Sequence, residues 1–321
     1  MNGSLLVAVT RWSRHVPAGV LRALFDVVAV GAWVGRAGGV RQLEVNLARV
    51  RPAASRGSVR RLALRGMRSY MRYYAETLEL SRLSPEQVRA RGRLVNAEHL
   101  EPAISEGRAV VLGLGHQANW DLAGAWVTLF LGPVTTVAEK LEPPELFESF
   151  MSFREGLGMT VIPLEGRDVF RDLVRVARTG TGIIPLLADR DLTHSGVEVD
   201  LVGSRARVAA GPAALALATG APLVPTTLHY ERLRGERRRR ARAGWGVVMT
   251  FHPPVALEPA AADAPRREQV AALSQRWVDA LSASIRAHPE DWHMLQKVFI
   301  DDLDPARYAR TRAEAGEEGP A

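Results

Sequence analysis

Cysteine is absent from the 321 residues, and lysine nearly so, since only Lys140 and Lys297 supplement the arginines. Without cysteine the chain has no disulfide, thiolate metal site or cysteine nucleophile, whereas sites built from His, Asp and Glu remain open. No uninterrupted apolar run reaches the about 18 residues of a transmembrane helix, and residues 1–20 lack the pattern of a signal peptide. We therefore expect a cytoplasmic protein that can lie on a membrane surface.

What is present is typical of a soluble globular chain, with 47% hydrophobic and 24% charged residues. The length allows one large α/β domain or two small ones. Basic residues exceed acidic ones, so the net charge is +7 and the isoelectric point is about 10.4. This charge favours anionic partners such as nucleic acid, anionic lipid or phosphorylated substrates.

The N-terminal part reads as helical. Residues 5–50 predict two or three helices, and residues 20–34 within them are apolar on most sides. That segment is typical of either a core helix or an interfacial membrane anchor. A clearer helix over 58–80 carries four arginines on one stripe: Arg61, Arg65, Arg68 and Arg72. The stripe is either a solvated face or a surface that meets anionic head groups.

From 94 to 256 short apolar runs alternate with helical segments. This alternation predicts an α/β fold with a central, mostly parallel sheet flanked by helices. The expected strands lie within 108–115, 132–140, 159–164, 181–189, 221–231 and 245–255, and the expected helices within 143–158, 168–180, 209–220 and 266–286. The basic stretch 232–246 is expected to form an exposed hairpin loop. We expect a single domain over 1–310, with a helical part over 5–92, an α/β core over 93–305 and a flexible tail over 311–321.

A histidine stands just beyond the first long strand of this core. His116 follows Gly113 and Gly115, and Asn119 is a good N-cap for the next helix, whose first turn contains Asp121. The carboxyl ends of strands are where open α/β sheets bind ligands. If Asp121 folds back to accept the ring N–H of His116, the pair is a general base with its orienting carboxylate. A structural His–Asp cap fits the same spacing. Since no serine or cysteine stands beside the pair, a catalytic reading makes the substrate's own hydroxyl the nucleophile.

Three further polar features lie further along the chain. Asp189, Arg190 and Asp191 follow another buried strand, as a salt-bridged turn or part of a His/Asp metal site. Arg154 stands alone on a helix, which usually indicates a surface charge. The stretch "HPEDWHMLQ", 288–296, is either a core-packing corner or part of a substrate wall.

Taken together, these stretches resemble a known family. "GHQANWDLAG" contains the His-x₄-Asp box of glycerolipid-type acyltransferases. Followed by "VAEKLEPPELFESFMSFREGLG", "ADRDLTHSGVEVDLVG", "GPAALALATGAPLVP" and "HPEDWHMLQ", it resembles the bacterial lipid A lauroyl/myristoyl acyltransferase superfamily. Within that superfamily the chain is most similar to the phosphatidylinositol mannoside acyltransferases. The resemblance covers about residues 20–305.

The resemblance implies a glycerolipid acyltransferase-like fold with membrane-associating N-terminal helices. It implies transfer of a long-chain fatty acyl group, often palmitoyl, from acyl-CoA to the 6-hydroxyl of a mannose on phosphatidylinositol mannoside. The implied partners are acyl-CoA, a phosphoinositide glycolipid acceptor and an anionic membrane surface. The expected protein is a monomer, peripheral on the cytoplasmic face of the cell membrane. It uses neither a metal nor a cofactor other than acyl-CoA as co-substrate.

The resemblance also assigns roles to residues. His116 matches the catalytic histidine, Asp121 the acid of the box, and Arg154 a helix arginine associated with the acceptor site. Where the family usually has a glutamate that completes a charge relay with the histidine, this chain has Asp189, which is one methylene shorter. Either Asp189 or Glu198 could therefore complete the relay. The expected substrate-binding residues are Arg154, Asn119, Trp120, Arg190 and Glu198.

Three other functions are compatible with parts of the sequence. The same histidine and carboxylates could hydrolyse an acyl-CoA thioester, or serve a different glycolipid acceptor. The arginine run within 232–246 could bind nucleic acid, but no nucleic-acid-binding motif accompanies it and aromatic residues are not interleaved with it. We therefore expect no nucleic-acid partner.

Overall fold

The structure is a computed structural model that describes residues 16–138, 144–164, 169–193 and 195–314. It begins with a helical layer of α2 (Ala18–Val34), α3 (Gly38–Val50), α4 (Arg56–Leu80) and α5 (Pro85–Arg91). Helices are therefore confirmed within 16–50, while residues 5–15 lie outside the described part. In the described residues no single helix has the length and hydropathy to span a membrane; α2 and α3 meet that test only as a pair bent by 78°.

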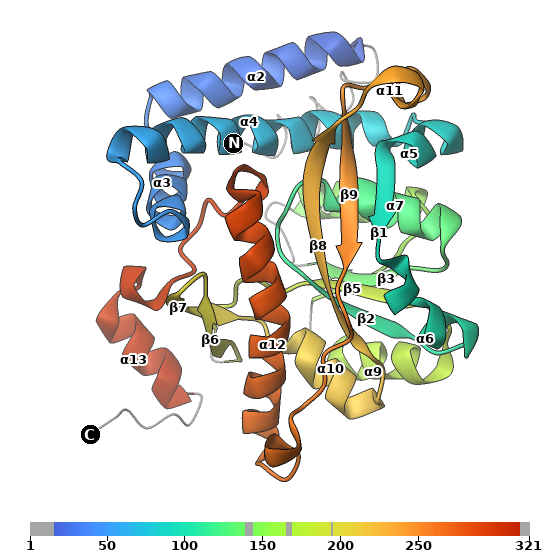
Figure 1. Cartoon of the computed structure of the whole chain (residues 1–321), viewed down its shortest axis with the longest axis vertical. Helices are drawn as coiled ribbons and strands as arrows, with labels where there is room; N and C mark the ends of the chain where they lie inside the picture. Colours follow the sequence, from blue (N-terminus) through green and yellow to red (C-terminus); the bar gives the residue numbers. More distant parts are fainter. Residues whose placement is uncertain (1–15, 139–143, 165–168, 194, 315–321) are drawn as a thin grey trace.

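The central sheet has five strands: β1 (Gly92–Val95), β2 (Val110–Leu114), β5 (Ile183–Leu187), β8 (Leu223–Arg232) and β9 (Trp245–Phe251). Their order across the sheet is β1-β9-β8-β2-β5 (Figure 1). Every neighbouring pair is parallel except β8 with β9. The mostly parallel central sheet expected from the sequence is confirmed.

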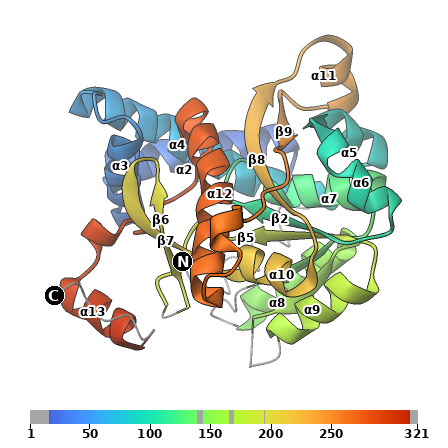
Figure 2. The ribbon, with the colours of Figure 1, turned by 60° about the horizontal axis from the view of Figure 1, so that its bottom comes forward.

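Two short strand pairs flank this sheet. β3 (Thr135–Ala138) runs parallel to β4 (Thr160–Pro163) and lies next to β5. β6 (Val197–Leu201) and β7 (Ser204–Val208) form an antiparallel hairpin beside α12 (Figure 2). This hairpin was not predicted from the sequence, although β6 has the alternating apolar and polar residues of a half-buried strand.

Helices cover both faces of the sheet. α12 (Arg266–Ala287) crosses one face and α7 (Trp120–Phe130) packs on the other (Figure 1). A Cβ atom at Gly113 of β2 would lie 3.1 Å from the Trp277 ring of α12, so glycine lets this helix pack directly on the strand. The remaining elements are η1 (Ala97–His99), α6 (Glu101–Ser105), α8 (Pro144–Gly156), α9 (Val169–Thr179), α10 (Gly211–Thr219), η2 (Pro259–Ala261), η3 (Pro289–Asp291), η4 (Ile300–Asp302) and α13 (Pro305–Glu314).

The basic stretch between β8 and β9 differs from its prediction. The hairpin is confirmed by the antiparallel pairing, but its connection contains a short helix, α11 (Gly235–Ala241), rather than an open loop. Arg237 explains part of the order, because its guanidinium donates to the carbonyl oxygens of Ala90 at 2.8 Å and Gly92 at 3.1 Å. The connection is thereby anchored to the start of β1.

The arginine stripe of α4 is divided. Arg61, Arg65 and Arg68 are exposed, and Arg68 pairs with Asp26 of α2 at 2.9 Å. Arg72 instead lies with its guanidinium carbon 3.8 Å from the centroid of the Trp245 ring, an intramolecular cation–π contact. The last arginine of the predicted stripe therefore supports packing between α4 and β9 and does not join the exposed charges.

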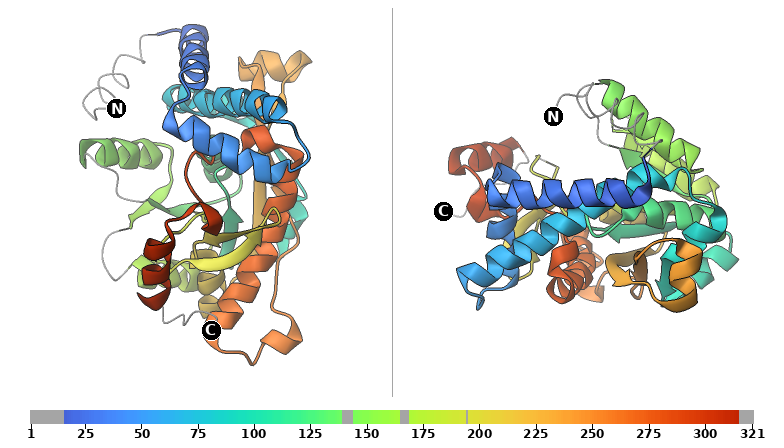
Figure 3. Two further views of the ribbon diagram at one scale, coloured as in Figure 1. Left: turned by 90° about the vertical axis from the view of Figure 1, so that its left-hand side faces the viewer. Right: turned by 90° about the horizontal axis from the view of Figure 1, so that it is seen from above.

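Helix α2 lies along α4 on the outside of the molecule (Figure 3). It buries Leu21 and Ala29 against the neighbouring helices. Its outer face leaves apolar side chains between 47% and 67% exposed, at Val20, Val27, Val28, Leu24 and Val34. α2 therefore contributes to a core on one side and presents an apolar strip on the other.

Candidate active site

Two neighbouring parallel strands bring the central pair together. β2 and β5 pair so that Leu114 lies opposite Leu187, and His116 and Asp189 each stand two residues further on. Both side chains consequently emerge at the same carboxyl-end edge of the sheet, where α/β proteins bind ligands. The distance from His116 Nδ1 to Asp189 Oδ1 is 2.5 Å. The aspartate is long enough for the relay contact that the sequence left open.

Asp189 is fully buried and held through both oxygens. Its Oδ2 accepts the backbone N–H of His116 at 3.0 Å and the indole N–H of Trp292 at 2.9 Å. Burial alone would raise the pKa of this carboxyl group. The charge and hydrogen bonds of His116, with the indole N–H of Trp292, outweigh burial and leave the pKa below its usual value. These interactions therefore favour the anionic form of the buried Asp189.

His116 has the properties of a general base. Burial opposes its charged form, but the negative charge of Asp189 and their hydrogen bond outweigh this effect and raise the pKa of His116. Because an ionised Asp189 can only accept a hydrogen bond, Nδ1 of the neutral ring carries the hydrogen, and Nε2 carries the free lone pair. The His116 side chain is 39% exposed, so a substrate hydroxyl can reach the ring. The pair can accept a proton at Nε2 and stabilise the resulting imidazolium.

The predicted contact between Asp121 and His116 is wrong. Asp121 stands in the first turn of α7, and its carboxylate lies between α4 and α8 instead of turning back to the preceding loop. Its Oδ2 accepts from the Tyr73 hydroxyl at 2.8 Å, and its Oδ1 accepts from Arg154 Nε at 2.8 Å. Asp189, distant in sequence, takes the orienting position that the spacing of the box suggested for Asp121.

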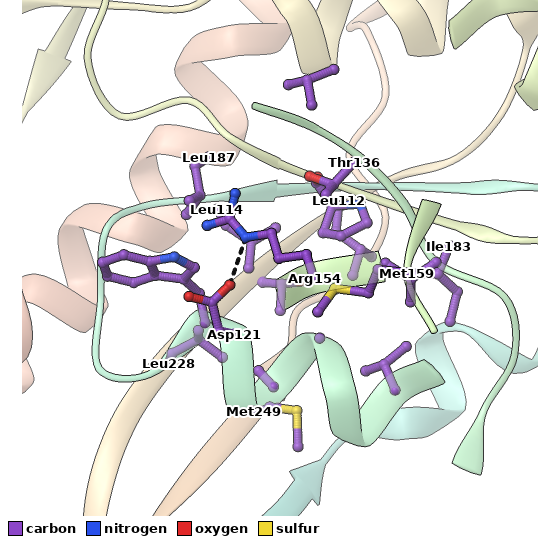
Figure 4. A pocket seen from close by; sticks show the side chains of 18 of the residues that line it. Leu112, Leu114, Asp121, Thr136, Arg154, Met159, Ile183, Leu187, Leu228 and Met249 are labelled. Atoms are coloured by element: carbon purple, nitrogen blue, oxygen red, sulfur yellow. Dashed lines mark hydrogen bonds and ion pairs between the residues drawn. The ribbon is translucent and has the colours of Figure 1, made fainter. Parts of the chain in front are cut away.

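Arg154 is not a surface charge. Its side chain is only 15% exposed and lies in the wall of a cavity between α7, α8 and the sheet, paired with Asp121 (Figure 4). The rest of the wall is mainly aliphatic and sulfur-containing, including Leu112, Leu114, Val127, Met159, Ile183 and Met249. The cavity is therefore apolar with one ion pair in its wall, a composition suited to a hydrocarbon chain attached to a polar group.

Trp120 connects the histidine to this cavity. Its ring lies edge-on to the His116 ring with centroids 5.4 Å apart, stacks on Tyr73 at 4.1 Å, and lines the cavity. Asn119 behaves differently from its predicted substrate-binding role. It is fully buried, caps α7 by accepting from the Leu122 N–H, and donates to Glu76. Asn119 is thus confirmed as an N-cap and is enclosed within the protein.

The remaining predicted site residues lie further out. Arg190 donates from Nε to the carbonyl oxygen of Lys297 at 3.0 Å, and its charge opposes protonation of His116. Glu198 lies on β6, where its carboxylate accepts from Arg205 and Tyr308, so it does not complete the relay with His116. In the described part of the chain no three His, Asp or Glu side chains are grouped to bind a metal ion.

The stretch 288–296 holds the turn that carries His116. The backbone N–H of His293 donates to the carbonyl oxygen of His116 at 2.8 Å. The backbone N–H of Ala118 donates to the carbonyl oxygen of Asp291 at 2.9 Å. Ala118 has a φ of 47°, a left-handed conformation that an alanine adopts only when its surroundings impose it. Trp292 adds its indole contact to Asp189. Sequence analysis assigned no role to Trp292 or Tyr73, because neither residue has a local signal linking it to its aspartate.

Comparisons with known proteins identify the family of this chain. The family of bacterial lipid A biosynthesis acyltransferases matches residues 2–300. The chain is 37% identical over 304 residues to the phosphatidylinositol mannoside acyltransferase of Mycobacterium tuberculosis (strain CDC 1551 / Oshkosh), covering 94% of this chain and 89% of the relative. It is also 37% identical over 302 residues to the protein of that name from Mycolicibacterium smegmatis (strain ATCC 700084 / mc(2)155), covering 94% of this chain and 92% of the relative. The resemblance seen in the sequence is confirmed. The chain belongs to the bacterial lipid A biosynthesis acyltransferase family and is an O-acyltransferase.

Proposed function

We propose that this protein transfers a long-chain fatty acyl group, palmitoyl in the first instance, from acyl-CoA to the 6-hydroxyl of a mannose on phosphatidylinositol mannoside. The acceptor is supported by the names of two relatives whose alignments cover 94% of this chain. The observation that carries the chemistry is the partly exposed His116, tied to buried Asp189 and adjoining Trp120 at an apolar cavity.

The proposed reaction uses His116 twice. Its Nε2 takes the proton of the mannose hydroxyl as the oxygen attacks the thioester carbonyl carbon. The carbon–sulfur bond then breaks, and the imidazolium returns the proton to the departing thiolate, which gives the ester and free CoA. Asp189 stabilises the imidazolium between these steps. In this scheme the protein forms no covalent intermediate and requires neither a metal nor a cofactor beyond acyl-CoA.

The apolar cavity is the proposed position of the fatty acyl chain. Its aliphatic wall would remove the chain from water, a gain of about 0.8 kcal/mol per buried methylene. Asp121 and Arg154, which form an ion pair, are the only charged residues among the described ones that line this cavity. We propose that Arg154 interacts with the polar end of a substrate near the cavity mouth. Arg190, whose charge opposes protonation of His116, is a second candidate for such a contact.

We further propose that α2 and the exposed arginines of α4 contact an anionic membrane. Helix α2 exposes an apolar face and packs along α4, which exposes Arg61 and Arg65, so the two helices together combine apolar and positive surface as interfacial helices do. Because acyl-CoA is a cytoplasmic metabolite, the proposed location is the cytoplasmic face of the cell membrane, with a peripheral monomer acting there. Sedimentation with liposomes tests this: binding should increase with anionic lipid, and equal binding to neutral liposomes would refute an electrostatic contribution.

The function is tested with radiolabelled palmitoyl-CoA and a panel of glycolipid acceptors. We expect the label on phosphatidylinositol mannoside, and a loss of about 10²–10⁴-fold for His116→Ala, the contribution typical of a general base. An unchanged melting temperature would show that the variant is folded. Full activity of the variant would remove His116 from the mechanism. Transfer to a different glycolipid would correct the acceptor, and release of free fatty acid unaffected by any acceptor would indicate a thioesterase.

A further inference from the structure

Trp292 and Trp277 are two fully buried tryptophans near the turn that carries His116. Of these two, only Trp292 forms a hydrogen bond to a described residue through its indole N–H. Its N–H donates to Asp189 Oδ2 at 2.9 Å. The other, Trp277, packs its ring against Gly113, and its buried indole N–H has no hydrogen-bond partner in the described part of the chain. The two side chains therefore have equal size and burial but different contacts with the site.

The indole of Trp292 and a backbone N–H share one oxygen of Asp189. Asp189 Oδ2 receives two N–H donors, from Trp292 and from the backbone of His116, so Oδ1 is the oxygen directed at Nδ1. The backbone of Trp292 is fixed in turn, because it forms an antiparallel bridge with Gln117, next to His116. The indole thus reaches the carboxylate from the same segment that holds the catalytic turn.

We propose that Trp292 is a positioning residue that acts on His116 through Asp189, holding the carboxylate by its second oxygen and weakening its attraction for the histidine proton. The assignment rests on the proposed role of His116 as general base. A carboxylate that is completely buried 2.5 Å from the ring favours the imidazolium, which cannot accept a proton. Each N–H donated to that carboxylate spreads its charge and makes it a weaker partner. Trp292 therefore keeps His116 in its neutral, active form nearer to neutral pH.

The other charged groups near His116 act on its protonation in opposite directions. Arg190 and Arg154 oppose its protonation, and Asp189 favours it. His293, the remaining titratable neighbour, is buried and its pKa is lowered to about 3 by burial and by the charges of Arg72 and His116, so it stays neutral across the working range. Of the partners of Asp189, Trp292 is the one whose side chain can be changed without altering His116 itself.

The test compares Trp292→Phe with Trp277→Phe. Both changes remove an indole N–H and similar volume, but only the first removes a donor from Asp189. A hydrogen bond to a charged group accounts for about a tenfold change in an equilibrium. For Trp292→Phe we expect the acid limb of the kcat–pH profile to shift to higher pH by about one unit. Activity should be about tenfold lower at pH values below the limb, with no comparable loss at pH values above it. Trp277→Phe should leave the limb in place.

Titration of the His116 ring by NMR gives a readout that does not require activity. The signal is assigned by its absence in His116→Ala, and its midpoint should rise in Trp292→Phe only. If the ring titrates as expected while no acyl transfer occurs, the proposed function fails and the role of Trp292 stands. A midpoint that stays in place, or that falls as in Asp189→Asn, overturns the role of Trp292.

A second measurement covers the case in which Trp292→Phe does not fold. In the otherwise unchanged chain, Asp189→Asn should shift the indole proton resonance of Trp292, since its acceptor loses its charge, and leave that of Trp277 unaffected. Equal shifts at the two indoles, or none at Trp292, would show that the contact is not formed in solution and would overturn the proposal.

Discussion

Replacing Asp189 with asparagine should remove the base function of His116 while leaving the fold intact. The structure fixes how the new amide would lie. Two N–H donors, from the His116 backbone and Trp292, point at the Oδ2 position, so the amide oxygen must occupy it. The amide nitrogen then faces His116 Nδ1 and donates to it. The ring is forced into the tautomer that carries its proton on Nε2, and Nε2 can no longer accept the substrate proton.

The size of the effect follows from this loss. General-base catalysis by a positioned side chain contributes about 10²–10⁴-fold in rate, and we expect Asp189→Asn to lose that range in kcat with little change in KM. The assay is acyl transfer from radiolabelled palmitoyl-CoA across a range of pH. NMR of the ring nitrogens should show the proton moved from Nδ1 to Nε2.

Asp121→Asn is the matched comparison, since it alters the aspartate of the His-x₄-Asp box. It removes the charge beside Arg154 and Tyr73 but has no contact with His116, so the acid limb of its pH profile should stay where the unchanged protein has it. An Asp189→Asn variant within tenfold of full kcat would refute the reasoning. A change of the His116 tautomer in Asp121→Asn would also refute it, because it would show that Asp121 orients the His116 ring.

Three further outcomes follow from the same contacts. Because the pKa of His116 is raised and the base must be neutral, kcat should rise with pH to a half-maximum above 6.5, measured as a pH profile; a midpoint below that value would contradict the Asp189 contact. In Gly115→Ala the new Cβ would lie 2.8 Å from Leu281 Cδ1 and 3.1 Å from Asp189 Oδ2, so we expect a stability loss of about 1–3 kcal/mol and a lower kcat, while Gly57→Ala, with open space around it, should show neither. Tyr73→Phe removes one donor from buried Asp121 and should cost about 1.5–3 kcal/mol in urea denaturation without moving the acid limb.

Local features of the site could be predicted from the sequence because they depend on neighbouring residues. Asn119 caps α7 as expected, and His116 stands beyond the end of a buried strand as expected. The partner of His116 could not be chosen this way, because Asp121 is near in sequence whereas Asp189 is near in space. The missing information was that β2 and β5 are neighbours in register. Once that is known, two polar residues at equal distances beyond paired strand ends identify each other.

Arg154 shows a second limit. An isolated arginine on a helix is exposed in most proteins, and α8 gives no local sign that its arginine turns inward. What makes burial possible is Asp121, which comes from another helix and accepts from the guanidinium within the cavity wall. The stretch 288–296 had two readings for a similar reason, since Trp292 contacts a carboxylate about a hundred residues away in sequence. Tertiary partners decide the role of a buried polar residue.

Asp189 and Asp121 therefore have separate roles, and the spacing of the His-x₄-Asp box does not bring its aspartate to its histidine. Asp189 forms the hydrogen bond to His116 Nδ1, whereas Asp121 pairs with Arg154 inside an otherwise apolar wall. A buried guanidinium without such a partner would be costly, so the aspartate of the box allows a positive charge beside the cavity. The four residues between His116 and Asp121 contain the turn, the cap and Trp120. They place the base and the charged wall at the two ends of one short segment, with the Trp120 ring between them.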